Sequence, residues 1–424
     1  MISARTSHYD RRGRLIVAGA IASVVLVCLI RIPWGCGKPA RITAPEPTAS
    51  KTVPNVRVLV TARPVETITL STTAGYHLGV DEHIISRSQV PLAEVAVVRS
   101  GRDWQLGKLN LQGSRVVLTA VPGGCISAGG VSYRGELRLM PVGDGGFSVV
   151  NHLDMPSYLA GVLARELYPN WSLETFRAQA IAARSFAIYH MLTFGKSHDY
   201  DLGSTQASQV YGGFAAETPK AWQAITSTSG QVLAYGKEGQ EQILMSQYSA
   251  CCGGWVNSAD VIRPAQNIPP FQGGQQCRDC AECPRYRWPV VSVRKSDLLG
   301  ALSVNYQEAR KLTEIAELRV VEQNAHGRPV WVDVVAPDAQ FVRLRAEDIR
   351  ISLLRADVEG ASKLHSMNCT IRNVGEFIEF ADGRGFGHGV GMCQWGAQHK
   401  AAAGVSCHDI LAFYYPGAKI FRAY

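Results

Sequence analysis

The sequence predicts an α+β fold, because its strand-like and helix-like patterns fall into successive blocks. Residues 55–150 alternate apolar and polar side chains in short runs, residues 154–192 change to helical periodicity, and mixed strands and short helices follow to the C-terminus. A parallel α/β sheet would instead require strands and helices in regular alternation, which the sequence lacks. We therefore expect a β-rich N-terminal part, a central helical pair and a mixed remainder.

Tight turns punctuate the β-rich part. Runs such as VRVLV, ETITLST and GELRLMPV alternate with a period of two, which is typical of half-buried strands. Clusters of Gly and Pro near residues 122–124 and 143–146 separate these runs, as turns between strands do. The pattern predicts strands only up to about residue 150.

Two helices are predicted at 156–168 and 173–192. Asp154 is a plausible N-cap of the first helix, with Pro156 in its first turn, and Pro169 ends it. Ser172 could cap the second helix, whose apolar stripe consists mostly of alanine. Small side chains along a stripe permit another element to approach closely.

The charge is concentrated at the N-terminus. The chain has 424 residues with 43 basic and 35 acidic side chains, a net charge of 43 − 35 = +8. Eight basic and two acidic residues fall within the first 51, so this leader carries +6 and the body only +2. A nearly neutral body excludes a generally basic nucleic-acid binder, and we expect no nucleic-acid partner.

The leader predicts a single transmembrane helix. An apolar run at 15–30 has arginines on both sides, so residues 1–34 are expected to be a cytoplasmic tail and signal-anchor. A cleaved signal peptide is the alternative. Residues 35–54, rich in Pro, Thr and Ala, are expected to be a flexible stalk. The body would then lie outside the cytoplasm, held at the cytoplasmic membrane.

Nine of the eleven cysteines lie in the body, and five of these fall within residues 251–283. The C-x2-C spacing of Cys277, Cys280 and Cys283 suits a metal knuckle, which Cys251 or Cys252 beside two glycines could complete as a structural zinc site. Of these two, Cys252 is the predicted ligand. Disulfides are the alternative in an exported protein. Cys125, Cys369, Cys393 and Cys407 are expected to be small buried residues or distant pairs.

Glu166 is the first candidate functional residue. It follows Leu159, Val162 and Leu163 at helical spacing, so it continues the apolar stripe of its helix. Burial disfavours the charged form of a carboxylic acid and raises its pKa, as a general acid requires. The alternative is a structural ion pair, with candidate partners Arg165, Arg177 and Arg184.

Five glycines occupy every second position of residues 383–391. In an extended segment this spacing leaves one face bare for the close approach of a ligand or another element. Phe386 would be available for stacking and His388 for hydrogen bonding. A dinucleotide site is rejected because no βαβ unit follows. The alternative is a tightly packed turn structure with a satisfied histidine.

Ordered motifs resemble the SpoIID/LytB family from about residue 135 to the C-terminus. They are Tyr158–Glu166 (YLAGVLARE), Ala178–Ser185 (AQAIAARS), Gln209–Gly213 (QVYGG), Tyr248–Gly254, Gly383–Ala397 (GRGFGHGVGMCQWGA) and Phe413–Gly417 (FYYPG). The resemblance implies that residues 151–424 form a catalytic core, with a cysteine-rich insertion at 251–283. It further implies action on bacterial peptidoglycan, with lytic transglycosylase activity on glycan strands stripped of their stem peptides.

The resemblance also implies roles for single residues. Glu166 matches the family's catalytic glutamate, and six further positions would line the glycan groove: Arg184, Gln209, Tyr211, Tyr248, His388 and Gln394. No cofactor is required for this chemistry. Some members have Cys and His residues that look like zinc ligands before the Gln-Val-Tyr motif, whereas residues 201–208 here read DLGSTQAS. Any metal at that position is therefore in doubt.

Lytic cleavage agrees with a single carboxylic acid. A hydrolase normally needs two carboxylates, whereas in lytic cleavage the 6-hydroxyl of the substrate itself attacks. The alternative function is a non-enzymatic protein that binds the cell wall and stimulates a partner amidase. A plain structural ectodomain would leave Glu166 and the alternating glycines unexplained.

Overall fold

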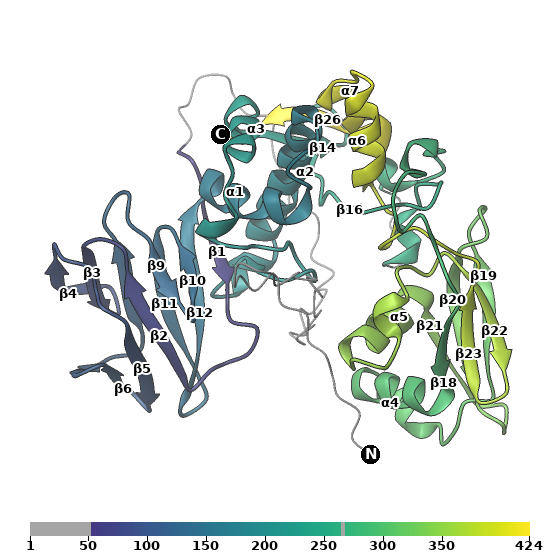
Figure 1. Ribbon diagram of the computed structural model, residues 1–424, viewed down its shortest axis with the longest axis horizontal. Coiled ribbons are helices and arrows are strands. Elements are labelled where there is room, and N and C mark those ends of the chain that lie inside the picture. The colour runs from purple at the N-terminus through teal and green to yellow at the C-terminus, as the bar shows by residue number, and fades with distance from the viewer. Residues whose placement is uncertain (1–51, 264–267) are drawn as a thin grey trace, which may run out of the picture.

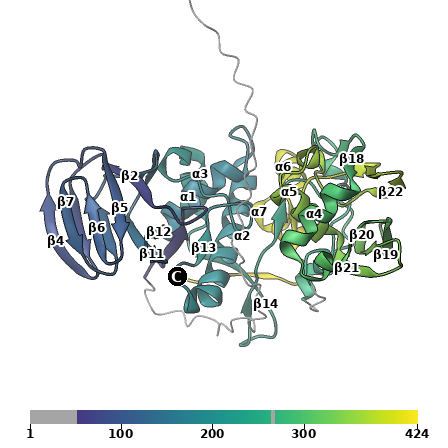
Figure 2. The same cartoon turned by 90° about the horizontal axis from the view of Figure 1, so that it is seen from below.

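The computed structural model describes residues 52–263 and 268–424 (Figure 1). The mixed α+β class is confirmed: a β-rich lobe, a group of helices and a second α/β lobe lie side by side, as the perpendicular view also shows (Figure 2). The predicted signal-anchor and nearly all of the stalk lie outside the described residues. Within the described residues, none of the helices combines the length and the apolar character needed to span a membrane.

The N-terminal lobe consists of two sheets that share one hydrophobic core. Its strands are β1 (Asn55–Leu59), β2 (Thr67–Thr72), β3 (Tyr76–Val80), β4 (His83–Ser88), β5 (Val95–Ser100), β6 (Asp103–Leu106), β7 (Leu109–Gln112), β8 (Val116–Ala120), β9 (Ile126–Ala128), β10 (Val131–Tyr133), β11 (Glu136–Val142), β12 (Gly146–Asp154) and β13 (Leu202–Gly203). One sheet has the order β13-β1-β12-β11-β8-β3-β4 and the other β10-β9-β2-β5-β6-β7. Trp104 and Phe147 meet edge to face between them, with ring centroids 5.3 Å apart.

The central part surrounds one long buried helix. Its elements are α1 (Met155–Glu166), α2 (Leu173–Leu192), α3 (Pro219–Ser227), β14 (Gln231–Tyr235), β15 (Gln242–Ile243), β16 (Tyr248–Ser249), β25 (Met392–Cys393), α6 (Gln394–Ala402), α7 (Cys407–Tyr414) and β26 (Lys419–Arg422). Helix α2 contacts α1, α3, α6, α7 and β14. The core of the N-terminal lobe continues into α1 and α2, so these two parts pack as one body.

The predicted helix ends agree with the structure in part, since α1 begins where expected but ends at Glu166 rather than at residue 168. The carboxylate of Asp154 caps α1 by accepting from the backbone N–H of Ser157 at 2.8 Å. Helix α2 has the expected bounds, but the Ser172 side chain makes no capping hydrogen bond. Gln398 of α6 holds this end instead, since its Oε1 accepts from the Ser172 N–H at 2.8 Å and from the Thr175 hydroxyl at 2.9 Å.

A second lobe interrupts the central part. Its elements are β17 (Arg287–Trp288), β18 (Val291–Arg294), α4 (Lys295–Asn305), β19 (Glu317–Gln323), β20 (Pro329–Val335), β21 (Phe341–Arg345), α5 (Ala346–Arg355), β22 (Thr370–Val374), β23 (Phe377–Ala381) and β24 (Gly383–Arg384). It has its own hydrophobic core and two three-stranded sheets, β18-β23-β22 and β19-β20-β21. We call residues 288–381 the inserted lobe. The sequence patterns did not reveal it as a separate unit.

Candidate functional site

Glu166 is the last residue of α1 and is half-buried. Its Oε1 accepts a hydrogen bond from the backbone N–H of Val210, and its Oε2 accepts one from Nε2 of Gln394, both at 3.2 Å. Burial raises the pKa of Glu166, and these two donors and the charge of Arg165 offset only part of that rise. The carboxyl group is thus biased toward its protonated form while it stays within reach of solvent.

The alternative role of Glu166, a structural ion pair, is not supported. Within residues 52–263 and 268–424, Glu166 forms no ion pair. Of the candidate partners, Arg177 pairs with Glu174, and Arg184 bonds to neutral groups. The apolar stripe therefore places this acid beside neutral hydrogen-bond donors.

Helix α6 supplies the side chain that donates to the acid. Strand β25 pairs in parallel with β16, and this pairing places the start of α6 beside Glu166. Nε2 of Gln394 also lies 3.4 Å from Oε1 of Gln179, a fully buried residue of α2 whose own Nε2 has no partner among the described residues. The sequence analysis assigned no role to Gln179. The only indication of one is that this residue is a single amide side chain in an otherwise alanine-rich stretch of the helix.

A second chain of hydrogen bonds runs from α1 to β16. The Tyr158 hydroxyl donates to Oε1 of Gln209 at 2.8 Å, and Nε2 of Gln209 donates to the Tyr248 hydroxyl at 2.9 Å. Burial raises the pKa of both tyrosines well above the ordinary value, so both stay neutral. Gln209 is itself buried, so it positions the half-buried Tyr248 rather than facing solvent.

Like Gln209, two further residues that were predicted to line the groove are buried. Arg184 is completely buried, and its guanidinium donates to the Tyr424 hydroxyl, the Gln231 carbonyl and the Ile225 carbonyl. Tyr211 is also buried; it packs on Tyr158 and donates to Asn151 at 2.9 Å. Both were expected to face substrate, but the tertiary packing turns them into the protein.

Arg184 therefore links α2 to β14 and to the C-terminal residue Tyr424. We expect Arg184→Ala to lower the free energy of unfolding by about 2 kcal/mol, since it removes packing and leaves buried acceptors without a donor. Urea denaturation followed by circular dichroism measures this change. The matched control is Arg177→Ala on the same helix, whose more exposed ion pair with Glu174 contributes less than about 1 kcal/mol. Equal losses of unfolding free energy in the two variants would contradict this structural role of Arg184.

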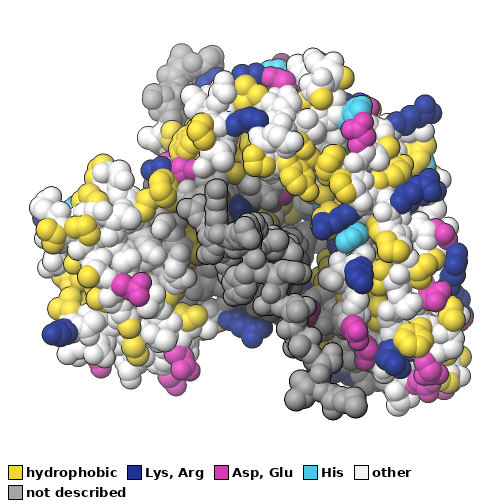
Figure 3. Space-filling view, in the orientation of Figure 1, with side chains coloured by type: hydrophobic (Ala, Val, Ile, Leu, Met, Phe, Trp, Pro, Cys, Tyr) yellow, Lys and Arg dark blue, Asp and Glu magenta, His cyan; other side chains and the backbone are white. Residues whose placement is uncertain are grey.

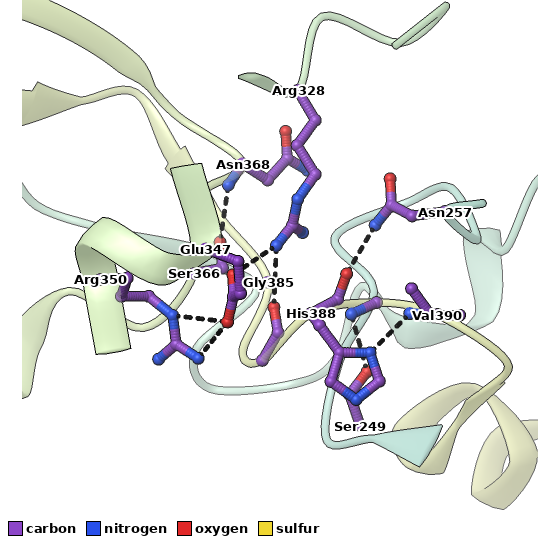
Figure 4. Close-up of polar contacts among 12 residues, drawn as sticks. Ser249, Asn257, Arg328, Glu347, Arg350, Ser366, Asn368, Gly385, His388 and Val390 are labelled. Atoms are coloured by element: carbon purple, nitrogen blue, oxygen red, sulfur yellow. Dashed lines mark hydrogen bonds and ion pairs between the residues drawn. The ribbon is translucent and has the colours of Figure 1, made fainter. Parts of the chain in front are cut away.

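His388 belongs to a polar network between the glycine-rich segment and the inserted lobe (Figure 4). Its Nδ1 accepts from the Val390 N–H at 3.0 Å, so the ring proton resides on Nε2. Burial lowers the pKa of His388 to about 4, which keeps the ring neutral at neutral pH. The His388 ring lies close to the backbone of Tyr248, whose hydroxyl accepts from Gln209.

The network continues through a buried ion triad. Arg328, which precedes β20, and Arg350 of α5 both contact Glu347, with Arg328 Nη2 3.1 Å from Oε2 (Figure 4). Burial alone would raise the pKa of Glu347, but the charges of Arg350 and Arg328 outweigh it and bring the pKa to about 2. Arg328 also donates to the carbonyl of Gly387 at 3.4 Å. The inserted lobe thus supports the backbone beside His388.

The glycine-rich segment is not an extended strand, which corrects the sequence analysis. Only Gly383 and Arg384 are in β24, whereas Gly385, Gly387, Gly389 and Gly391 have positive φ between 67° and 96°. A Cβ at Gly389 would lie 2.3 Å from Nδ2 of Asn257, and one at Gly391 2.0 Å from the Gln247 carbonyl. The glycines permit the close approach of another segment of the same chain.

Three aromatic side chains from the two segments that carry Glu166 and Gln394 form one group. Tyr168, Trp171 and Trp395 contact one another with ring centroids 5.1–5.8 Å apart. Tyr168 is 54% exposed, Trp395 half-buried and Trp171 buried. The sequence analysis did not single them out, although Tyr168 and Trp395 lie two and one residues from Glu166 and Gln394.

Four buried cysteines also converge. The Sγ atoms of Cys252, Cys277, Cys280 and Cys393 all lie within 4.8 Å of one another. Cys393 thus takes the position that the sequence analysis gave to Cys283, because β25 brings the chain back beside Cys252.

In the segment where some family members carry Cys and His, Asp201 instead pairs with Arg57 at 2.7 Å.

Comparisons with known proteins agree with the motifs. A family model described as Stage II sporulation protein matches residues 143–235, which include Glu166, and a domain of unknown function (DUF8618) matches 261–391. An uncharacterized protein of Brachyspira hyodysenteriae is 30% identical over 69% of this chain and 73% of its own length. The chain belongs to the SpoIID/LytB family.

Two named relatives come from Bacillus subtilis. Stage II sporulation protein D is 26% identical over 65% of this chain and 76% of its own length. The amidase enhancer is 25% identical over 62% of this chain, but the match spans only 40% of the enhancer's own length. The first of these names refers to sporulation and the second to the enhancement of an amidase, each for that relative alone.

Proposed function

We propose that this protein is a peptidoglycan lytic transglycosylase that cleaves glycan strands stripped of their stem peptides and leaves 1,6-anhydromuramic ends. The observation that carries the proposal is the environment of Glu166: an acid whose pKa is raised by burial, in contact with two neutral donors and still half-exposed. Within the described residues, the hydrogen bonds of Glu166 come from the neutral Val210 N–H and the neutral Gln394 amide. Hydrolases normally use a pair of carboxylates, whereas lytic cleavage needs one.

In the proposed reaction, protonated Glu166 donates its proton to the glycosidic oxygen as the bond from that oxygen to C1 breaks. The 6-hydroxyl oxygen of the same sugar forms a bond to C1, and its proton passes to the Glu166 carboxylate. The acid is regenerated and no water is consumed. Burial favours the acid at the start, and the Val210 N–H and Gln394 stabilise the carboxylate between the two transfers.

Neutral groups near Glu166 suit an uncharged sugar. Tyr248 and His388 are both neutral and could orient hydroxyl and N-acetyl groups. On the face that Figure 3 shows, basic and acidic side chains are interspersed over the inserted lobe rather than gathered by sign. Recognition through hydrogen bonds and stacking, more than through charge, fits this surface. A cell-wall substrate would lie outside the cytoplasm, where the run at 15–30 would hold the body at the membrane.

The aromatic group provides the stacking surface in this proposal. We expect Tyr168→Ala to raise KM about fivefold with little change in kcat, because the exposed ring is worth about 1 kcal/mol of contact with a sugar face. Steady-state kinetics on purified glycan strands measure both constants. Tyr168→Phe keeps the ring and should behave like the unsubstituted protein. An unchanged KM in Tyr168→Ala would remove this ring from the substrate site.

The direct test is incubation of the full chain with stripped glycan strands and with intact cell wall, followed by mass spectrometry. Products that end in 1,6-anhydromuramic acid support the proposal. Products with ordinary reducing ends would indicate hydrolysis and contradict it, as would the absence of products from both substrates.

The second candidate is an enhancer of a cell-wall amidase, which the name of one relative favours. In that case the protein would release no glycan fragments itself. It would accelerate peptide release by an added amidase, and replacement of Glu166 would not affect this acceleration.

A further inference from the structure

The four converging cysteines come from three segments that are distant in sequence. Cys252 lies just after β16, Cys277 precedes a short 3-10 helix (Arg278–Cys280) that ends at Cys280, and Cys393 is the last residue of β25. Each side chain is at most 1% exposed. The fold therefore brings four thiols into one closed, apolar space.

Their spacing fits a single metal ion. Sγ of Cys252 and Sγ of Cys280 are 3.6 Å apart, and all four sulfur atoms lie within 4.8 Å of one another. A tetrahedral zinc ion with bonds of about 2.3 Å places its sulfur ligands about 3.8 Å apart. Disulfides would join the sulfur atoms in pairs at about 2.05 Å, which does not account for four mutually close thiols.

Hydrogen-bond donors point at the sulfur atoms. The backbone N–H groups of Cys252 and Gly396 lie 3.3 and 3.4 Å from Sγ of Cys393, at the N-terminus of α6. The Tyr414 hydroxyl lies 3.2 Å from Sγ of Cys277. Such donors stabilise thiolates and fix the orientation of metal ligands.

The approach of α6 depends on a missing side chain. A Cβ at Gly396 would lie 2.5 Å from Sγ of Cys277 and 2.2 Å from the Tyr414 hydroxyl oxygen. The first turn of α6 therefore packs directly against Sγ of Cys277 and the Tyr414 hydroxyl, with no room for a side chain at residue 396.

We propose that Cys252, Cys277, Cys280 and Cys393 bind one zinc ion as four thiolates. Four protein ligands fill a tetrahedral shell, so the centre has no open position and is structural. The metal joins the cysteine-rich segment to the start of α6, where the next residue, Gln394, donates to Glu166. It therefore fixes the position of Gln394, and this consequence for activity rests on the proposed function.

Cys283 provides a matched control. It is buried, belongs to the same segment and continues the C-x2-C spacing, but it lies outside the group of four. Serine at Cys393 should abolish zinc binding, whereas serine at Cys283 should leave it intact. The sequence spacing alone would predict a requirement for Cys283.

The experiment uses the full chain, purified from zinc-supplemented cells under reducing conditions. Elemental analysis should give about one zinc per chain, and dialysis against a weak chelator should lower this below about 0.1 in Cys393→Ser but not in Cys283→Ser. Exchange of zinc for Co²⁺ in the unsubstituted protein should give the visible and charge-transfer bands of a tetrahedral tetrathiolate. This spectrum is informative even where Cys393→Ser does not fold.

Three results would overturn the proposed zinc centre. The first is less than about 0.1 zinc per chain in the unsubstituted protein, and the second is a Co²⁺ spectrum without thiolate bands. The third is a loss of metal in Cys283→Ser together with its retention in Cys393→Ser. Zinc content does not depend on catalysis. Active protein without zinc would refute the metal centre alone, and zinc-loaded protein that releases no glycan products would refute the proposed function alone.

Discussion

Glu166→Gln is expected to lower the rate of glycan cleavage about 1,000-fold, which is typical for the loss of a general acid and base. The amide cannot give a proton to the glycosidic oxygen, nor take one from the 6-hydroxyl. Its size and shape match the carboxylic acid, so substrate binding should change little and the loss should appear in kcat. Quantification of 1,6-anhydromuramic ends by mass spectrometry measures this rate.

The same substitution should raise the stability of the protein at neutral pH. The unfolded chain releases the Glu166 proton near the ordinary pKa of 4.5, whereas the folded chain holds it to a higher pH because of burial. Between these two values the folded state binds more protons, so its stability falls as the pH rises. The amide does not titrate, and the stability gain of Glu166→Gln should therefore appear above pH 4.5 and level off above the raised pKa.

The surrounding amides can accommodate the change. Rotation of both the Gln394 and the Gln179 amides would present the Gln394 oxygen to the new amide and to Nε2 of Gln179, which has no partner among the described residues and would donate to that oxygen. The control is Glu174→Gln on α2, a carboxylate that pairs with Arg177 instead. Glu174→Gln should keep full activity. Cleavage at the unsubstituted rate by folded Glu166→Gln would refute the catalytic role of Glu166.

Gly396→Ala is expected to destabilise the protein by about 3 kcal/mol and to abolish zinc binding. The added methyl group would lie within 2.5 Å of Sγ of Cys277 and closer still to the Tyr414 hydroxyl, so α6 must shift away from the cysteine group. Urea denaturation and elemental analysis measure the two effects.

Gly300→Ala is the control for this substitution. Gly300 also lies in a helix, α4, but a Cβ there would meet nothing within 4 Å. Alanine favours helix over glycine, so Gly300→Ala should raise stability by up to about 1 kcal/mol and leave the zinc content unchanged. If Gly396→Ala retained both zinc and the stability of the unsubstituted chain, α6 would not be fitted against the cysteines.

The sequence predicted best what depends on neighbouring residues. The Asp154 cap, the bounds of α2 and the placement of Glu166 on an apolar stripe all follow from local spacing, and the structure confirms them. The C-terminal end of helix α1 is only partly buried, so the helix keeps a recognisable apolar face. A polar residue on that face, Glu166, could therefore be picked out from the sequence.

Predictions that depend on tertiary packing were less accurate. Helix α2 is buried on most sides, with 13 of its 20 residues buried, so periodicity could not show whether Arg184 faces substrate or the protein. Cys393 is 141 residues from Cys252, and nothing in the local spacing connects them. A still larger separation, 228 residues, concealed the contact between Gln394 and Glu166.

The inserted lobe begins and ends at a single two-stranded ribbon, where Trp288 of β17 pairs with Gly383 of β24. Residues paired across antiparallel strands lie about 5 Å apart, so the chain departs from the central part and returns to it at nearly the same place. Seen from the central part, the whole lobe therefore behaves as one loop whose two ends are held together by the β17–β24 pair. The entropy cost of closing a loop depends only weakly on its length, so insertions or deletions in the lobe change this cost little. Changes in length at the far turns of the lobe should therefore have little effect on the hydrogen bonds of Glu166, whereas loss of Arg328 or Glu347 would remove the support that the lobe gives to the backbone beside His388.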